Sequence, residues 1–250
     1  GYQGVKKVQL RGRNSAISNS AETVWGPAAG TYARLTTGTA LEVLSSSAAD
    51  DGDPAGTGAN TVVVEGLDSD YLPFSETVTL NGTTVVPLAN TSVRAVNKVY
   101  VATAGSGLTN AGTITVQTVS GDVAKATITT GPYLGLGQSA DFIYTIPDNY
   151  VGILKDVYFS ATGVTGDLTV YLLSTDSNGI IKSEGSGKSS LYVTSFNGAR
   201  GKIHFGSGLV VPEKTQIELR AIVSAGAGDL VAQADLFLIN KSFSQWGTGA

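Results

Sequence analysis

The stretch Thr77-Val78-Thr79-Leu80-Asn81-Gly82-Thr83-Thr84-Val85-Val86 decides the fold class. Thr and Val are enriched in β-strands because their branched side chains pack well on a pleated surface. Asn-Gly supplies the positive φ angles of a type I′ turn, whose twist matches that of the strands on either side. The stretch therefore predicts a β-hairpin.

The same signals recur along the 250-residue chain, which contains 32 glycines. They predict strands at 40–44, 61–65, 92–101, 112–116 and 123–128, and then at 141–146, 151–160, 168–173, 191–194, 202–205, 216–223 and 231–239. With the hairpin, the first series suffices for a small sandwich. The second series, about eight antiparallel strands, indicates a jelly roll. We therefore predict an all-β protein with two antiparallel β-sandwich units, the C-terminal one jelly-roll-like.

The segment 130–137 interrupts the alternation and predicts the boundary between the units. The resulting organisation has four parts. They are an extended N-terminal arm at 1–20, an N-terminal β-sandwich or barrel at 21–130, a C-terminal jelly-roll-like β-sandwich at 131–240 and a polar tail at 241–250.

Composition excludes several classes of protein. The net charge is −4 and the basic residues do not cluster, so we expect no nucleic-acid partner. The chain has no cysteine, which excludes disulfides, thiolate metal sites and thiol nucleophiles. No apolar run reaches the roughly 18–20 residues of a membrane-spanning helix, and Gly1–Lys7 lacks the apolar core of a signal peptide, so we expect no membrane insertion.

Each candidate catalytic motif in the sequence lacks residues that its chemistry requires. His204 is the single histidine, and no Gly-x-Ser-x-Gly turn accompanies it, so we interpret it as a strand residue and not as a catalytic base. One histidine without cysteine also argues against catalytic zinc. Ser183–Ser189 imitates a phosphate-binding loop, but Lys182 stands where its first glycine belongs and no helix follows. We predict a protein that is not an enzyme, with no catalytic residues and no cofactor.

Calcium is the more open question, because Asp50-Asp51-Gly52-Asp53 places three carboxylates in one loop. Ala55 occupies the third ligand position of an EF-hand order and no Glu closes the loop, so we favour a solvated loop and predict no metal site. Asp68-Ser69-Asp70 and Asp176-Ser177-Asn178-Gly179 are typical of turns in which side chains bond the nearby backbone.

Sugar recognition is a further possibility. Glycosidases use paired carboxylates, and the twenty acidic residues of this chain do not reveal such a pair in sequence. Sugar-binding sites use exposed aromatic rings with polar neighbours. The candidates are Trp25, Tyr71, Phe74, Tyr133 and Trp246, each of which is more often a core or interface residue.

Several blocks together resemble one family. They are Glu22-Thr23-Val24-Trp25-Gly26, Gly30-Thr31-Tyr32, Ser45–Asp51, Gly56–Thr61, Val64–Asp68, Ser75–Thr84, Ala104–Thr115, Tyr144-Thr145-Ile146-Pro147 with Val151-Gly152, and Val211–Ile217. The chain resembles, over nearly its whole length, a virion structural protein of marine tailed bacteriophages, including those of cyanobacteria and Pelagibacter. Pro87 departs from the Thr-rich strand expected after Asn81-Gly82.

The resemblance implies a component of the virus particle, in the capsid decoration or the tail, without catalytic residues. Its partners would be other virion proteins and copies of itself, with a homotrimer favoured. The arm would anchor it, because Lys6, Lys7, Arg11 and Arg13 could meet an acidic neighbour. Two alternatives stay open. One is an adhesin or carbohydrate-binding module for a host-surface glycan, and the other is a glycan-cleaving enzyme.

Overall fold

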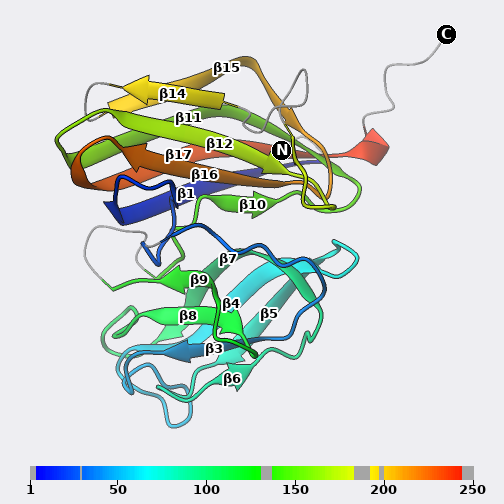
Figure 1. Ribbon diagram of the computed structural model, residues 1–250. Coiled ribbons are helices and arrows are strands. Elements are labelled where there is room, and N and C mark those ends of the chain that lie inside the picture. The colour runs from blue at the N-terminus through cyan, green and yellow to red at the C-terminus, as the bar shows by residue number, and fades with distance from the viewer. Residues whose placement is uncertain (1–3, 29, 131–136, 183–191, 197–199, 244–250) are drawn as a thin grey trace. The chain divides into compact units, whose positions relative to one another are not determined.

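The computed structural model describes residues 4–28, 30–130, 137–182, 192–196 and 200–243. Strands make up 61% of the chain, and the one helical element within the described residues is the 3₁₀ turn Lys241–Phe243. The chain divides into two compact units (Figure 1). The jelly-roll unit comprises Gly1–Val24, Ala28–Thr31 and Phe142–Ala250, and the inserted unit comprises Trp25–Pro27 and Tyr32–Asp141. The protein is all-β, as predicted.

The jelly-roll unit contains two antiparallel sheets. The first has the order β1 (Val5–Ile17), β17 (Gly226–Asn240), β11 (Tyr150–Val164), β15 (Arg200–Val211). The second has the order β10 (Ile143–Thr145), β16 (Gln216–Val223), β12 (Leu168–Thr175), followed by β13 (Ile181–Lys182) and β14 (Tyr192–Phe196), which both pair with β12. Counted along the chain without β2 and β13, the eight main strands give sheets ordered 1-8-3-6 and 2-7-4-5. That order is the topology of a jelly roll, so the prediction for the C-terminal sandwich is confirmed.

The predicted N-terminal arm is wrong, because residues 5–17 form β1, the first strand of the jelly roll. β1 pairs with β17 from Val5 opposite Ile239 to Ile17 opposite Gly228. Leu10 and Ile17 are buried in the jelly-roll core. Two of the four basic side chains reach acids of the same sheet: Lys7 pairs with Asp235 at 2.8 Å, and Arg13 binds both oxygens of Asp229 at 2.5 and 2.7 Å, while Arg11 donates to Gln9. Basic residues interspersed with small and polar ones are also typical of loops, so the sequence did not reveal this strand.

The second strand of the jelly roll is interrupted by the inserted unit. β2 (Glu22–Thr23) and β10 lie along the same edge of β16, with Thr23 opposite Arg220 and Ile143 opposite Glu218. Between them, Val24 N–H donates to Leu219 O at 2.8 Å, and Leu219 N–H donates to Phe142 O at 3.1 Å. Val24 and Phe142 thus share the two bonds that one residue opposite Leu219 would make. The sequence predicted two units in succession, whereas the structure has one unit inserted into a strand of the other.

The inserted unit is a sandwich of two antiparallel sheets. One has the order β6 (Val86–Pro87), β3 (Leu41–Ser45), β8 (Ile114–Thr118), β9 (Ala124–Ile128), and the other β5 (Pro73–Thr79), β4 (Ala59–Asp68), β7 (Val93–Ala104). Its core is contributed by the inward residues of both sheets, including Leu41, Val62, Val64, Val99 and Ile114. The unit ends at Asp141 and not at 130. Residues 131–136 of the predicted boundary and 244–250 of the predicted tail lie outside the described residues.

The predicted hairpin at Asn81-Gly82 is also wrong. β5 pairs with β4, while β6 pairs with β3 in the other sheet, so the two flanks are not partners. A tight turn does form, since Thr84 N–H donates to Asn81 O at 2.9 Å. The central residues of this turn are Gly82, which has a φ of 54°, and Thr83, which is outside the left-handed region, so the turn is not type I′. Val78 and Leu80 are buried in the core, which draws this segment across from one sheet to the other.

Candidate functional site

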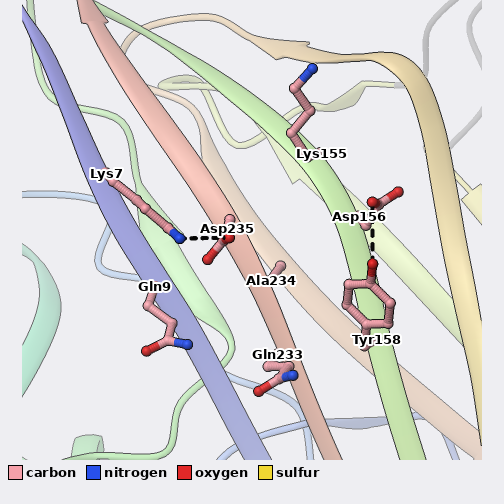
Figure 2. Close-up of a pocket in the computed structure, with 8 residues that line it drawn as sticks. All are labelled: Lys7, Gln9, Lys155, Asp156, Tyr158, Gln233, Ala234 and Asp235. Carbon is pink, nitrogen blue, oxygen red and sulfur yellow. Dashed lines mark hydrogen bonds and ion pairs between the residues drawn. The ribbon is translucent and has the colours of Figure 1, made fainter. Parts of the chain in front are cut away.

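The outer face of the β1-β17-β11-β15 sheet carries a polar hollow (Figure 2). A bulge in β11 shapes it. Leu154 and Val157 lie opposite successive inward positions of β17, so Lys155 and Asp156 together occupy the place of one residue. Leu154 and Val157 are fully buried, while Lys155 is exposed and Asp156 is partly exposed. The bulge therefore places a cation and an anion side by side on the outer face.

The hollow has a volume of about 210 Å³ and is formed by three strands. Its lining residues come from β1, β17 and β11; they are Lys7, Gln9, Lys155, Asp156, Tyr158, Gln233, Ala234 and Asp235. The lining contains two lysines and two aspartates, so its formal charge is zero. It also contains two amides and one aromatic ring, which can bind a polar, uncharged group.

Asp156 is the centre of a cluster on this face. His204 Nδ1 donates to its Oδ1 at 2.5 Å, and Lys202 Nζ lies 3.3 Å from Oδ2. The hydrogen bond from His204, and secondarily the one from Lys202, lowers the pKa of Asp156 below its ordinary value. The prediction that His204 is a strand residue is confirmed, because it lies in β15 with its side chain 62% exposed. Its partner is a carboxylate of the neighbouring strand.

Asp50 is not part of a solvated loop, because its side chain is completely buried. Its carboxylate accepts four hydrogen bonds of 2.6–2.8 Å, from Ser45 Oγ and from the backbone N–H groups of Ala59, Ala111 and Gly112. Asp51 Oδ1 accepts from the backbone N–H of Asp53. Asp50 therefore fastens three loops of the inserted unit. No group of three His, Cys, Asp or Glu in the described ranges could hold a metal ion.

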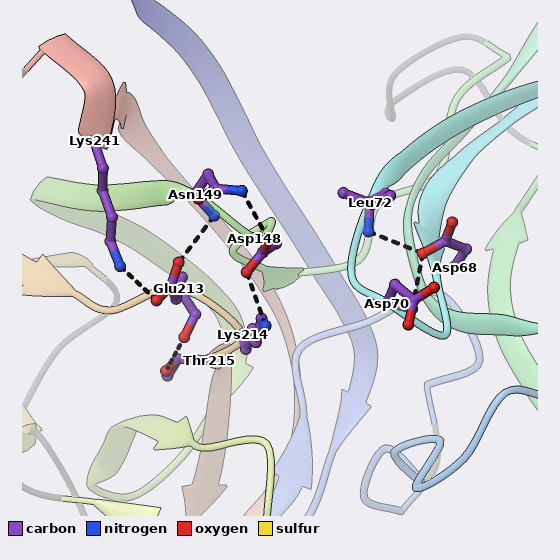
Figure 3. A network of polar contacts seen from close by, with 9 residues as sticks. All are labelled: Asp68, Asp70, Leu72, Asp148, Asn149, Glu213, Lys214, Thr215 and Lys241. Carbon is purple, nitrogen blue, oxygen red and sulfur yellow. Dashed lines mark hydrogen bonds and ion pairs between the residues drawn. The ribbon is translucent and has the colours of Figure 1, made fainter.

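The other two acidic turns form as predicted. Asp68 Oδ1 accepts from the backbone N–H groups of Asp70 and Leu72, both at 2.9 Å (Figure 3). Asp176 Oδ1 accepts in the same way from Asn178 and Ile180 at 2.9 Å. In both turns the carboxylate organises its own backbone and does not form a site.

A second network joins turns of the jelly-roll unit (Figure 3). Glu213 forms an ion pair with Lys241 and accepts from Asn149 N–H at 2.9 Å, while Lys214 pairs with Asp148 at 2.8 Å. The Lys241 ammonium and the Asn149 N–H lower the pKa of Glu213. These contacts fasten the end of β17 to the turns before β11 and β16.

The sugar-site aromatics predicted from the sequence belong to the interior where the structure describes them. Trp25 is 5% exposed and packs edge to face against Tyr32, with ring centroids 5.4 Å apart. Tyr71 is 7% exposed, and its hydroxyl accepts from Arg94 Nε at 3.0 Å. Phe74 packs against the core of the inserted unit. Tyr133, Trp246 and the Ser183–Ser189 loop lie outside the described residues.

Sequence reasoning missed Asp141, which closes the inserted unit. Its Oδ1 accepts from Gly26 N–H at 2.9 Å, but its Oδ2 is buried without a partner among the described residues. Trp25 Nε1 and Thr127 Oγ1 are also buried without a hydrogen-bond partner among the described residues. Burial raises the pKa of Asp141 to about 7, against the smaller effects of backbone hydrogen bonds from Gly26 and Thr127. The sequence could not identify Asp141 as a site, because its partner Gly26 lies 115 residues away along the chain and Thr127 belongs to β9.

No protein-family model matches this chain, and no curated protein matches its sequence. The chain is similar to structures of infectious bursal disease virus. For the Gt strain the identity is 13% and the TM-score 0.22, over 95% of this chain and 68% of that one. For the Gx strain the identity is 12% and the TM-score 0.24, over 95% of this chain and 73% of that one. For T=1 particles derived from the virus the identity is 13% and the TM-score 0.23, over 97% of this chain and 67% of that one. TM-scores this low do not establish a shared fold, so these similarities carry no argument about the chain. In the described part of the chain, no helix is long and apolar enough to cross a membrane.

Proposed function

We propose that this chain is a structural component of a virus particle, in the capsid decoration or the tail of a marine tailed bacteriophage. It would act through repeated contacts with copies of itself and with other virion proteins, and not through catalysis. The observation that carries the proposal is the jelly roll whose second strand accommodates a complete second sandwich. Jelly rolls recur in viral capsid and lectin domains, a correspondence of fold and not of site.

The sequence blocks that resemble phage virion proteins support the same proposal, and they occur in both units: Ser75–Thr84 in the inserted unit and Val211–Ile217 in the jelly roll. The composition suits a particle outside a cell, because the chain has no Cys and no Met to oxidise. Both ends of the inserted unit leave the jelly roll at one point, opposite Leu219. A unit attached in this way can vary without disturbing the ladder of the sheet that carries it.

The test is immunogold labelling of purified phage particles with antibodies raised against the whole chain. Gold at regular positions on the capsid or the tail is the expected result. A chain that is present in lysates of infected cells but missing from purified particles, by labelling and by mass spectrometry, would overturn the proposal. Light scattering of the purified chain checks the proposed homotrimer separately, since a monomer over the micromolar range would contradict it.

A further inference from the structure

We infer that the hollow on the outer face of the β1-β17-β11-β15 sheet binds one pyranose ring of a glycan. The first argument is its aromatic wall. The Tyr158 side chain stands on the outer face of β11 and is 45% exposed, although tyrosine rings bury readily. Lys202 Nζ covers the ring at 5.2 Å from its centroid, but Lys202 does not line the hollow. The side of the ring that lines the hollow is therefore the one left for a ligand.

The second argument is the supply of hydrogen-bonding groups around that ring. Among the described residues, none hydrogen-bonds the Gln233 amide, which lies opposite Tyr158 on β17 (Figure 2). Gln9 uses its Oε1 to accept from Arg11, and within the described residues its NH₂ has no hydrogen-bond partner. Asp235 pairs with Lys7 through Oδ2, at 2.8 Å. Donors and acceptors thus surround an apolar ring face, which is what a ring of C–H groups and hydroxyls requires.

The third argument excludes other ligands. The lining balances two lysines against two aspartates, so it lacks the clustered cations that a nucleic-acid backbone requires. The hollow lies on the face of the sheet, over β1, β17 and β11, and not along its edge, so a peptide bound here cannot extend the sheet. Its volume of about 210 Å³ lies below the roughly 300–1,000 Å³ of pockets that enclose drug-sized ligands, so it takes a single ring.

Lys155 sets the preference among sugars. Among the described residues its Nζ has one long contact, 3.4 Å to Ser207 O, while Lys7 and Lys202 each have a carboxylate partner. A carboxylate on the sugar would supply the missing partner. The site therefore favours chains that contain uronic acid over neutral hexose chains.

The experiment is a printed array of neutral and uronate-containing glycans, probed with the full chain and followed by calorimetric titration of a tetragalacturonate and of cellotetraose. The wild type should bind the array, with tetragalacturonate favoured. Tyr158→Ala should weaken the titrated affinity at least tenfold, and Gln233→Ala about fivefold. Tyr158→Phe should stay within threefold of wild type, because it keeps the ring and the hydrogen bond from the phenol to Asp156 is long, at 3.4 Å.

Tyr171→Ala is the matched control, since Tyr171 is a partly exposed tyrosine on β12 of the other sheet. It should bind as the wild type does, and circular dichroism should show all variants folded. Lys155→Ala should remove the preference for tetragalacturonate. The inference is overturned if no glycan on the array binds, or if binding survives Tyr158→Ala unchanged. Neither result bears on the location of the chain in a particle, which the labelling experiment decides.

Discussion

The ion-paired carboxylates of the jelly roll and two carboxylates of the inserted unit, Asp50 and Asp141, are bound in different ways. In the jelly roll, carboxylates pair with cations at or near the surface, as in Arg13–Asp229, Lys7–Asp235 and Lys241–Glu213. In the inserted unit, Asp50 is fully buried and the Oδ2 atom of Asp141 is buried, and both carboxylates have backbone N–H groups as partners. Exposed pairs contribute little and are screened by salt, whereas a buried carboxylate is costly to disturb. The inserted unit should therefore lose stability when Asp50 is replaced and when Asp141 releases its proton.

The largest expected effect follows from Asp50→Ala. The substitution leaves the buried N–H groups of Ala59, Ala111 and Gly112 without an acceptor. At about 1–3 kcal/mol for each unsatisfied group, the inserted unit should lose roughly 5 kcal/mol and could fail to fold. Urea unfolding in a Trp246→Phe background reports this unit, because Trp25 is then the one tryptophan left. Asp51→Ala, in the same loop, should cost less than about 1 kcal/mol; an equal loss in both variants would contradict the comparison.

The second effect is the pH dependence caused by Asp141. Its pKa is raised from 3.8 to about 7, so between these values the folded chain keeps a proton that the unfolded chain releases. The stability of the inserted unit should therefore fall as pH rises through this window, by a total on the order of 4 kcal/mol. Asp141→Asn keeps an oxygen for Gly26 N–H and should abolish the fall, so that at pH 8 the variant is the more stable protein.

The measurement is the same tryptophan-reported urea unfolding, at pH 5 and pH 8, for wild type and variant. Hydrogen exchange of β17 and β11 provides the internal control, since these strands belong to the jelly roll. A wild-type inserted unit that is equally stable at both pH values would show that Asp141 is accommodated as a carboxylate. That outcome would remove the contrast between the units.

The third effect belongs to the jelly roll and to the junction. A Cβ on Gly12 of β1 would lie 2.5 Å from Val24 O and 2.6 Å from Phe142 Cβ. Gly12→Ala should therefore separate β1 from the two residues that share the place opposite Leu219, at a cost of about 1–3 kcal/mol for overpacking. Hydrogen exchange should increase in β1 and β10 and not in β4. Ala16→Ser, at an exposed position of β1, is the control and should have no effect. Gly121→Ala would not serve as a control, because Gly121 has a positive φ.

The sequence predicted the features that depend on local patterns and missed those that depend on distant partners. Alternation and turn residues placed most strands of both sandwiches, because a buried face leaves a local period of two. They missed β1, whose hydrogen-bonding partner β17 lies more than two hundred residues away, and they paired the flanks of Asn81-Gly82 wrongly because sheet membership depends on distant neighbours. The same holds for the hollow. Tyr158 could be placed on the outward face of its strand, but the bulge at Lys155 is visible only in the pairing with β17.

The smallest effect tests whether the inserted unit interrupts a strand that is otherwise complete. Thr23 lies opposite Arg220 and Ile143 opposite Glu218, so one residue fits between them. Deleting residues 24–141 joins Thr23 to Phe142 and leaves that single residue, whereas deleting 25–141 leaves two. The first variant should fold as a jelly roll with β2 and β10 in one register. The second must bulge, which leaves a ladder bond unmade and costs about 1 kcal/mol more.

Thermal unfolding by circular dichroism compares the two deletion variants directly, and hydrogen exchange of β16 shows whether its outer edge remains paired. Both variants lose the inserted unit together with Ala28–Thr31, so they differ only in the register and in the buried side chain of Val24, which the 25–141 deletion keeps. Equal stability would mean that β2 and β10 do not act as one strand, and failure of both to fold would mean that the jelly roll depends on the unit it carries. If the variant that lacks 24–141 is the more stable one, β2 and β10 act as one continuous strand opposite Leu219, both in their hydrogen bonds and in their contribution to stability.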